Sequence, residues 1–207
     1  MRSSISVGLV LLGIAVAAQP LALKNGRAGV ISIGGRSSFS FFNGGEASGS
    51  GRGIGGQVRV RLADRVNTDW FYDYLTAPIG GFAHRQDQHI GWNVLFYLRE
   101  PTEARQFIQP YVLAGHCFDY SKQQANDDPR NSAERWSSAV QAGLGTHFNL
   151  TDRTDISLVC QYMLHLGTDV HAETHEGAVE FHSGDGGGLE GHLLAHLSFN
   201  YKLFDAW

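Results

Sequence analysis

The sequence predicts an all-β protein, namely an eight-stranded antiparallel up-and-down transmembrane β-barrel with short periplasmic turns and long extracellular loops. Three observations lead to this prediction. Segments in which apolar and polar residues alternate recur along the chain, eight such segments can be counted, and the connections between them are alternately short and long. Alternation with a period of two indicates strands whose two faces meet different surroundings.

The clearest alternation lies in the last stretch, from Gly191 to Trp207, with Leu194 and Phe204 as exceptions. This stretch is longer than the roughly 5–6 residues of most soluble strands, and it reaches the roughly 9–11 residues of a tilted membrane-spanning strand. Its apolar face carries Leu193, Ala195, Leu197, Phe199, Tyr201, Leu203 and Trp207, and its polar face carries His192, His196, Ser198, Asn200 and Lys202.

The beginning of the chain has the features of a secretory signal peptide. An apolar run from Ile5 to Ala18 follows Arg2, and small residues precede the expected cleavage site after Ala18, with Ala22 as the second choice. The run is shorter than the roughly 20 residues of a membrane-spanning helix. The expected organisation is a cleaved signal peptide over residues 1–18, a periplasmic leader over 19–29 and the barrel over 30–207.

Seven alternating segments precede the last one. In the third, Trp70 and Tyr72 alternate with Asp69 and Asp73, whereas the fifth is the weakest because His116 shares its apolar face. The predicted strands are Val30 to Phe42, Gly53 to Ala63, Thr68 to Thr76, Gln88 to Arg99, Phe107 to Tyr120, Trp136 to Leu150 and Asp155 to Asp169.

The lengths of the connections favour a membrane barrel over a soluble sandwich. Outer-membrane barrels have tight turns on the periplasmic rim and longer loops on the outer rim. The short connections are Asp64 to Asn67, Glu100 to Gln106 and Thr151 to Arg153, and the long ones are Asn43 to Arg52, Ala77 to Asp87, Ser121 to Arg135 and Val170 to Gly188.

The apolar faces are suited to lipid. No Lys, Arg, Asp or Glu falls at mid-strand on these faces, where Arg or Lys would cost roughly 2–4 kcal/mol in a bilayer. Aromatic residues near strand ends are typical of interfacial girdles: Phe41, Trp70, Trp92, Phe118, Tyr120, Trp136 and Trp207. Alternation alone also fits a secreted soluble lipocalin-like binder, in which the apolar faces would point inward.

The phrase PYVLAGHCFDY, at Pro110 to Tyr120, and the terminal aromatic Trp207 add a specific likeness. With the eight alternating strands, they resemble small outer-membrane barrels of the OmpA/OmpX-like type, the outer membrane protein beta-barrel domain. The resemblance implies the cell outer membrane of a Gram-negative bacterium. It also implies a monomer whose partners are outer-membrane lipid and the insertion machinery, which would read the strand that ends in Trp207.

Eight-stranded barrels have an interior that side chains fill. The polar faces therefore predict a polar plug made of Arg36, Arg59, Arg61, Asp69, Asp73, His89, Arg99, Gln141, His147, His165, Glu190, His192 and His196. Within it, we expect an ion-pair cluster of Arg59, Arg61, Asp69 and Asp73. A three-residue loop, Arg65 to Asn67, would place Arg59 opposite Asp73 and would thus hold the register.

The function expected from these features is structural, or loop-mediated binding at the cell surface, without enzyme activity or a cofactor. The formal net charge of −4 and the absence of a Lys/Arg run give no surface for nucleic acid. The alternative is a lipid-modifying hydrolase similar to lipid A deacylases, because His182 and Ser183 adjoin near Glu180 and Asp185. The phenylalanine-x-His-x-Ser-Asn phrase of that family is absent.

Two further expectations concern single residue types. The long segment from Val170 to Gly188 carries His171, His175 and His182 among acidic residues, and imidazole with carboxylate is a ligand set for zinc, copper or nickel. We therefore consider a metal site there if the loop coils locally. The two cysteines, Cys117 and Cys160, fall on opposite faces of their strands and are expected to be free.

Overall fold

The computed structural model describes residues 28–42, 50–99, 106–167, 170–175, 178–183 and 191–207. The predicted signal peptide and most of the predicted leader lie outside these residues. The strands in the described part are β1 (Val30–Phe42), β2 (Ser50–Ala63), β3 (Val66–Ile79), β4 (Ala83–Tyr97), β5 (Ile108–Ala125), β6 (Ser132–Asn149), β7 (Thr154–Leu166), β8 (Val170–His175), β9 (Ala178–Ser183) and β10 (Gly191–Asp205).

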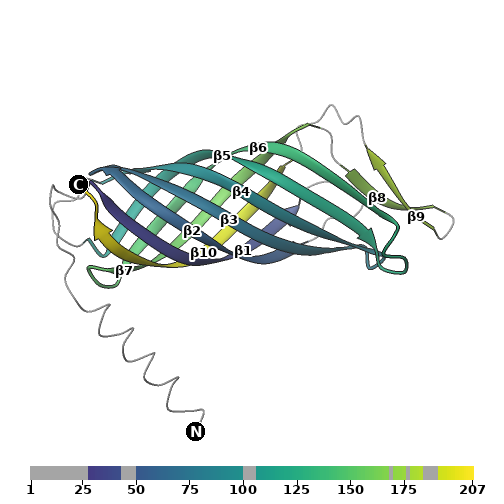
Figure 1. Cartoon of the computed structure of the whole chain (residues 1–207), viewed down its shortest axis with the longest axis horizontal. Helices are drawn as coiled ribbons and strands as arrows, with labels where there is room; N and C mark the ends of the chain where they lie inside the picture. Colours follow the sequence, from purple (N-terminus) through teal and green to yellow (C-terminus); the bar gives the residue numbers. More distant parts are fainter. Residues whose placement is uncertain (1–27, 43–49, 100–105, 168–169, 176–177, 184–190) are drawn as a thin grey trace, which may run out of the picture.

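Eight of these strands close into one barrel, as the sequence predicted. Their order around the barrel is β1-β10-β7-β6-β5-β4-β3-β2, each neighbouring pair is antiparallel, and β1 pairs with both β10 and β2. Strands β8 and β9 form a separate antiparallel hairpin. Figure 1 shows this hairpin at one end of the barrel and the C-terminus at the other. Within the described residues, no helix is long and apolar enough to cross a membrane.

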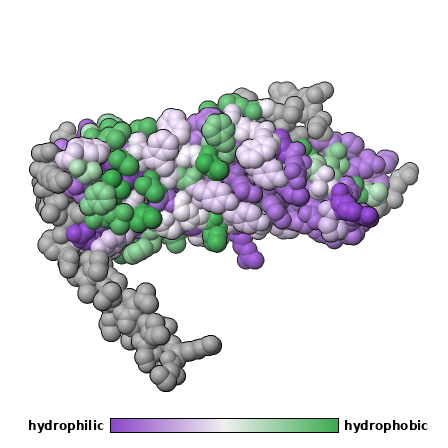
Figure 2. Space-filling view, in the orientation of Figure 1, coloured by the Kyte–Doolittle hydropathy of each residue, from purple (hydrophilic) through white to green (hydrophobic). Residues whose placement is uncertain are grey.

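The barrel turns its apolar residues outward and its polar residues inward. Trp70 and Trp136 are 54% and 71% exposed, whereas Asp73 and Asn200 have no exposed surface. This orientation contradicts the lipocalin-like alternative, in which the apolar faces would line the interior. Apolar side chains gather over the half of the barrel next to the C-terminus, and the end that carries β8 and β9 is hydrophilic (Figure 2).

A β-bulge explains one of the exceptions in the last strand. The pairing of β1 with β10 shifts by one residue between Ile31 and Ser32, so that Ile31 lies opposite Phe204 and Ser32 opposite Lys202. Because the extra residue reverses the facing of the residues beyond it, Phe204 points outward and Asp205 is buried. The other exception, Leu194, keeps its parity and is fully buried in the interior.

The strands near the hairpin are longer than predicted. The predicted loops at 77–87 and 121–135 consist mainly of strand, and the predicted long loop after β3 is replaced by residues 80–82. In this tight turn the amide of Phe82 donates to the carbonyl of Ile79 over 3.1 Å. Gly80 and Gly81 have φ of 54° and 80°, which glycine adopts without the penalty that a Cβ imposes.

The predicted three-residue turn between the second and third strands is wrong. Only Asp64 and Arg65 connect β2 to β3. A two-residue turn still leaves the inward residues of the two strands facing each other, because the register shifts by one residue between Arg61 and Ala63. The turn lies earlier in the chain and is shorter than predicted, and the extra residue shifts the pairing by one more, so that Arg59 lies opposite Asp69 rather than Asp73.

The outward face of β10 offers a test of the barrel's surroundings. Leu197 lies near the middle of this strand and is 51% exposed, so Leu197→Arg should lower the free energy of unfolding in lipid vesicles by roughly 2–4 kcal/mol. Ser132→Arg, at the exposed outer end of β6, should change it by less than about 0.5 kcal/mol. Urea titrations followed by tryptophan fluorescence measure both values. Equal effects would mean that Leu197 faces water.

Candidate functional site

The interior contains nearly all of the polar residues that the alternation placed there. Arg99 is a correction, because β4 ends at Tyr97 and the Arg99 side chain is exposed. Glu190 lies outside the described residues. All the others are buried: Arg36, Arg59, Arg61, Asp69, Asp73, His89, Gln141, His147, His165, His192 and His196.

The centre of this interior is Arg36 on β1. Its guanidinium lies 2.7 Å from Asp73 Oδ2 and 3.5 Å from Asp69 Oδ2, and it stacks 4.4 Å above the centre of the Phe71 ring. The acidic residues belong to β3, which is separated from β1 by β2. The sequence prediction named both aspartates but assigned them to other arginines.

A glycine makes this ion pair possible. Gly55 on β2 lies opposite Arg36 on one side and opposite Asp73 on the other. A Cβ atom at Gly55 would lie 2.1 Å from Asp73 Oδ1 and 2.3 Å from the carbonyl oxygen of Tyr72. The missing side chain therefore leaves the space through which Arg36 reaches across β2. Sequence reasoning placed Gly55 in the second predicted strand and did not assign it this role.

The two arginines of the predicted cluster have other partners. Arg59 Nη2 lies 2.6 Å from Asp155 Oδ2 on β7, across the lumen. Arg61 donates to the carbonyl oxygens of Ala63 and Asp64, and its guanidinium lies 4.6 Å from the centre of the Tyr97 ring. The four predicted residues are thus all buried in the interior, but they are divided among separate interactions.

A second carboxylate centre, around Asp119, lies nearer the hairpin end. Its oxygens lie 3.3 Å from His89 Nε2, 3.1 Å from His165 Nδ1 and 3.4 Å from Arg135 Nη2. Asp119 has no exposed surface. Sequence reasoning missed Asp119, although this residue lies two positions after Cys117 and therefore faces the same, inward side of β5.

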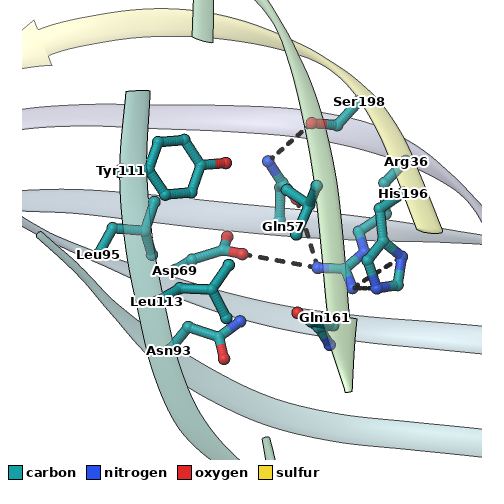
Figure 3. A pocket seen from close by; sticks show the side chains of 11 residues that line it. Arg36, Gln57, Asp69, Asn93, Leu95, Tyr111, Leu113, Gln161, His196 and Ser198 are labelled. Carbon is teal, nitrogen blue, oxygen red and sulfur yellow. Dashed lines mark hydrogen bonds and ion pairs between the residues drawn. The ribbon is translucent and has the colours of Figure 1, made fainter. Parts of the chain in front are cut away.

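Apolar side chains separate these polar centres. One group contains Leu95, Tyr97, Tyr111 and Leu113, with Val159 packed against it. Between this group and Arg36 lies a small cavity with room for roughly one water molecule. Figure 3 shows Arg36, Asp69, Tyr111 and His196 around it.

The predicted metal residues lie in the outer hairpin. His171 lies opposite His182, and His175 lies opposite Ala178. The local coil that would have brought His171 and His175 together is a strand, in which four residues span roughly 13 Å. In the part of the chain that the structure describes, no group of three or more His, Cys, Asp or Glu residues is arranged to hold a metal ion.

The cysteine prediction is confirmed. Cys117 and Cys160 are both free, the first buried and the second exposed. They lie on β5 and β7, which are separated by β6, and they point to opposite sides of the barrel wall.

Comparison with known proteins agrees with this architecture. A family model described as the outer membrane protein beta-barrel domain matches residues 8–200. Neisserial surface protein A superposes with a TM-score of 0.62 at 10% identity, over 84% of this chain and 97% of that one. No curated protein matches the sequence significantly.

Two barrels from Pseudomonas aeruginosa are also similar. The N-terminal β-barrel domain of OprF has a TM-score of 0.53 at 12% identity, over 85% of this chain and 98% of its own. OprG has a TM-score of 0.51 at 14% identity, over 88% of this chain and 100% of its own. At these identities the likeness shows a shared fold.

The pairing of Arg36 with Asp73 predicts which second substitution repairs a first. Asp73→Ala leaves a buried guanidinium without its nearest carboxylate, which should cost about 3–5 kcal/mol of unfolding free energy. Adding Arg36→Met to the Asp73→Ala variant should restore most of the lost free energy of unfolding. Adding Arg59→Met should not, because Arg59 pairs with Asp155. Urea unfolding of the wild type, Asp73→Ala and the two double variants measures these free energies. Rescue by Arg59→Met but not by Arg36→Met would support the register first expected from the sequence.

Proposed function

Because the chain belongs to the outer membrane protein beta-barrel domain family and is located in the cell outer membrane, we propose that it acts through its outer end and passes no solute through its lumen. The observation that supports this most directly is the polar extension of β5 and β6, which continues beyond the apolar half of the barrel and carries the β8–β9 hairpin (Figure 1).

A closed lumen is supported by the bulk and pairing of the inward side chains. Tyr97 and Tyr111 are 1% and 2% exposed and meet edge to face, with ring centres 5.9 Å apart. Beside these two tyrosines, the ion pair of Arg36 with Asp73 joins β1 to β3, and the ion pair of Arg59 with Asp155 joins β2 to β7. Moving a solute through would separate these buried ion pairs, whose charges are costly to leave unpaired.

The extension gives the outer end a defined shape. Lys122 on β5 lies 2.8 Å from Glu134 on β6, and this hydrogen bond lowers the pKa of the Glu134 carboxyl. The hairpin is attached to the extension at two points, because Gln123 donates to the carbonyl of Val170 and Asn131 donates to that of Val179 over 2.7 Å. A binding surface built on such strands is held in place before a partner arrives.

The charge of the hairpin indicates the kind of partner. Between residues 170 and 183 the sequence contains Glu173, Glu176 and Glu180 but no Lys or Arg. Glu173 and Glu180 lie directly opposite each other, and both are exposed. Like charges at such positions destabilise a strand pair. A partner that brings Lys or Arg side chains would remove this repulsion, so we propose a basic protein surface as the partner.

We extend the proposal to the barrel's other contacts and to its chemistry. The outward aromatic and aliphatic residues would contact outer-membrane lipid, and the closed barrel leaves no free strand edge, which favours a monomer. The strand that ends near Trp207 would be read by the insertion machinery. We propose no enzymatic role. His182, the histidine of the hydrolase alternative, contacts Glu180, with Nε2 and Oε2 3.3 Å apart, and both side chains are exposed.

The closed lumen predicts that the purified barrel will produce no unitary current in a planar bilayer in molar potassium chloride. It also predicts that liposomes containing the barrel will not swell in a small sugar. A porin inserted in the same bilayers is the positive control. Discrete current steps whose frequency rises with the amount of barrel would contradict the closed lumen.

The acidic hairpin predicts binding to a basic probe. With the barrel in phosphatidylcholine nanodiscs, an immobilised lysine-rich peptide should retain the wild type, and the affinity should fall several-fold in a Glu173→Gln, Glu180→Gln double variant. Asp152→Asn removes an exposed carboxylate from the turn between β6 and β7, away from the hairpin, and is the control that should leave the affinity unchanged. Surface plasmon resonance at two salt concentrations measures the affinities. Equal binding by the double variant and the wild type would refute the proposed partner chemistry.

A further inference from the structure

Two sulfur atoms and an imidazole nitrogen lie close together in the outer half of the lumen. Met163 is the one methionine of the chain besides Met1. Its Sδ lies 3.8 Å from Cys117 Sγ and 3.3 Å from His192 Nε2. The three residues are 0%, 0% and 1% exposed.

The strand arrangement explains how these residues meet. Met163 on β7 and His192 on β10 are direct cross-strand partners. Cys117 is on β5, on the far side of β6 from Met163. Its partner on β6 is Ala139, which is fully buried, and this small side chain leaves the space in which the two sulfurs come together. Phe71, Leu75 and Leu194 complete an apolar belt around them.

The imidazole of His192 is oriented from its other side. Its Nδ1 lies 3.0 Å from the hydroxyl oxygen of Ser40, which is fully buried on β1. When Nδ1 carries the hydrogen and donates to Ser40, Nε2 presents its lone pair toward Met163. A second hydrogen bond of this kind fixes the tautomer of most metal-ligating histidines.

The two separations from Met163 Sδ fit ligands that share one ion. With bonds of about 2.3 Å to sulfur and about 2.0 Å to nitrogen, as zinc makes, ligand atoms at tetrahedral angles lie roughly 3.8 Å apart for two sulfurs and roughly 3.5 Å for sulfur and nitrogen. The two distances around Met163 Sδ are close to these values. Thiolate and thioether ligands select Cu(I) among biological metal ions.

Charge also favours a monovalent ion. When Cys117 binds, its thiol proton is released to solvent, and a singly charged cation with one thiolate, a neutral thioether and a neutral imidazole has no net charge. A divalent ion would leave one positive charge at the site, and the neighbouring carboxylate, Asp119, already contacts His89, His165 and Arg135, so that this charge would lack a partner of its own. We therefore propose that Cys117, Met163 and His192 form a binding site for Cu(I).

Silver(I) is a suitable probe because it has the same charge and softness and is not readily oxidised. Cys160→Ser is the parent protein, since the exposed Cys160 thiol would bind silver by itself. The barrel is refolded in detergent with silver nitrate present, so that access through the closed lumen does not limit binding, and excess ion is then removed. A difference in migration between unheated and boiled samples on gels verifies folding.

The parent protein should retain one silver ion per barrel, as quantified by elemental mass spectrometry. Competition with a soluble thiol should show at least tenfold weaker retention after Met163→Leu, which preserves the side-chain volume, and after Cys117→Ala. Ser40→Ala should weaken retention by roughly 10–100-fold, as the loss of an orienting partner does. Absence of bound silver in the folded parent would overturn the proposal, and so would unchanged retention in folded Met163→Leu.

Discussion

The buried charge of Arg36 is the constraint on which most of this interior depends. A guanidinium in a narrow lumen needs carboxylates within reach, and the nearest ones belong to a strand two positions away around the barrel. The pairing therefore requires that Gly55, on the intervening strand, lack a side chain and that the register place it between Arg36 and Asp73. One ion pair thus links the composition of β2 to the pairing of three strands.

The same requirement shapes the rest of the lumen. Arg59 reaches Asp155 on the opposite wall, and Asp119 receives His89, His165 and Arg135. Each centre neutralises charge where it is buried, and apolar groups lie between the centres. The layered arrangement both supports the barrel and, in our proposal, keeps solutes from crossing it. The soft donors around Met163 lie in one of the apolar layers, which is why a neutral metal complex is the form we propose there.

At the outer end the same strands serve a different purpose. Strands β5 and β6 remain paired beyond the apolar band, at residues such as Lys122 and Glu134. This polar part of the sheet carries the β8–β9 hairpin. Hydrogen bonds from the side chains of Gln123 and Asn131 to backbone carbonyls give this hairpin its attachment. Glu173 and Glu180 are therefore held at a defined place. In the function that we propose, the partner recognises this pair of like charges.

The amino-acid sequence was sufficient to establish the fold class and the direction in which most side chains point. Successive residues of a strand must face opposite sides, so the inward positions of Arg36, Asp73 and His192 and the outward position of Trp136 could be obtained by counting. The free state of the two cysteines came from the same parity. Strand ends were less accurate, because polar residues continue the alternation of β5 and β6 beyond the membrane and resemble a loop.

The tertiary structure was needed to decide which inward residues meet. Contacts across the lumen depend on the registers of several strand pairs together, and one extra residue shifts every later contact along the strand. The bulge between Arg61 and Ala63 shifted the partner of Arg59 by one residue, in addition to the shift caused by the shorter turn. The bulge in β10 likewise turned Phe204 outward. The meeting of Cys117, Met163 and His192 had no local signal, because it joins three strands whose relative positions are set by closure of the whole barrel.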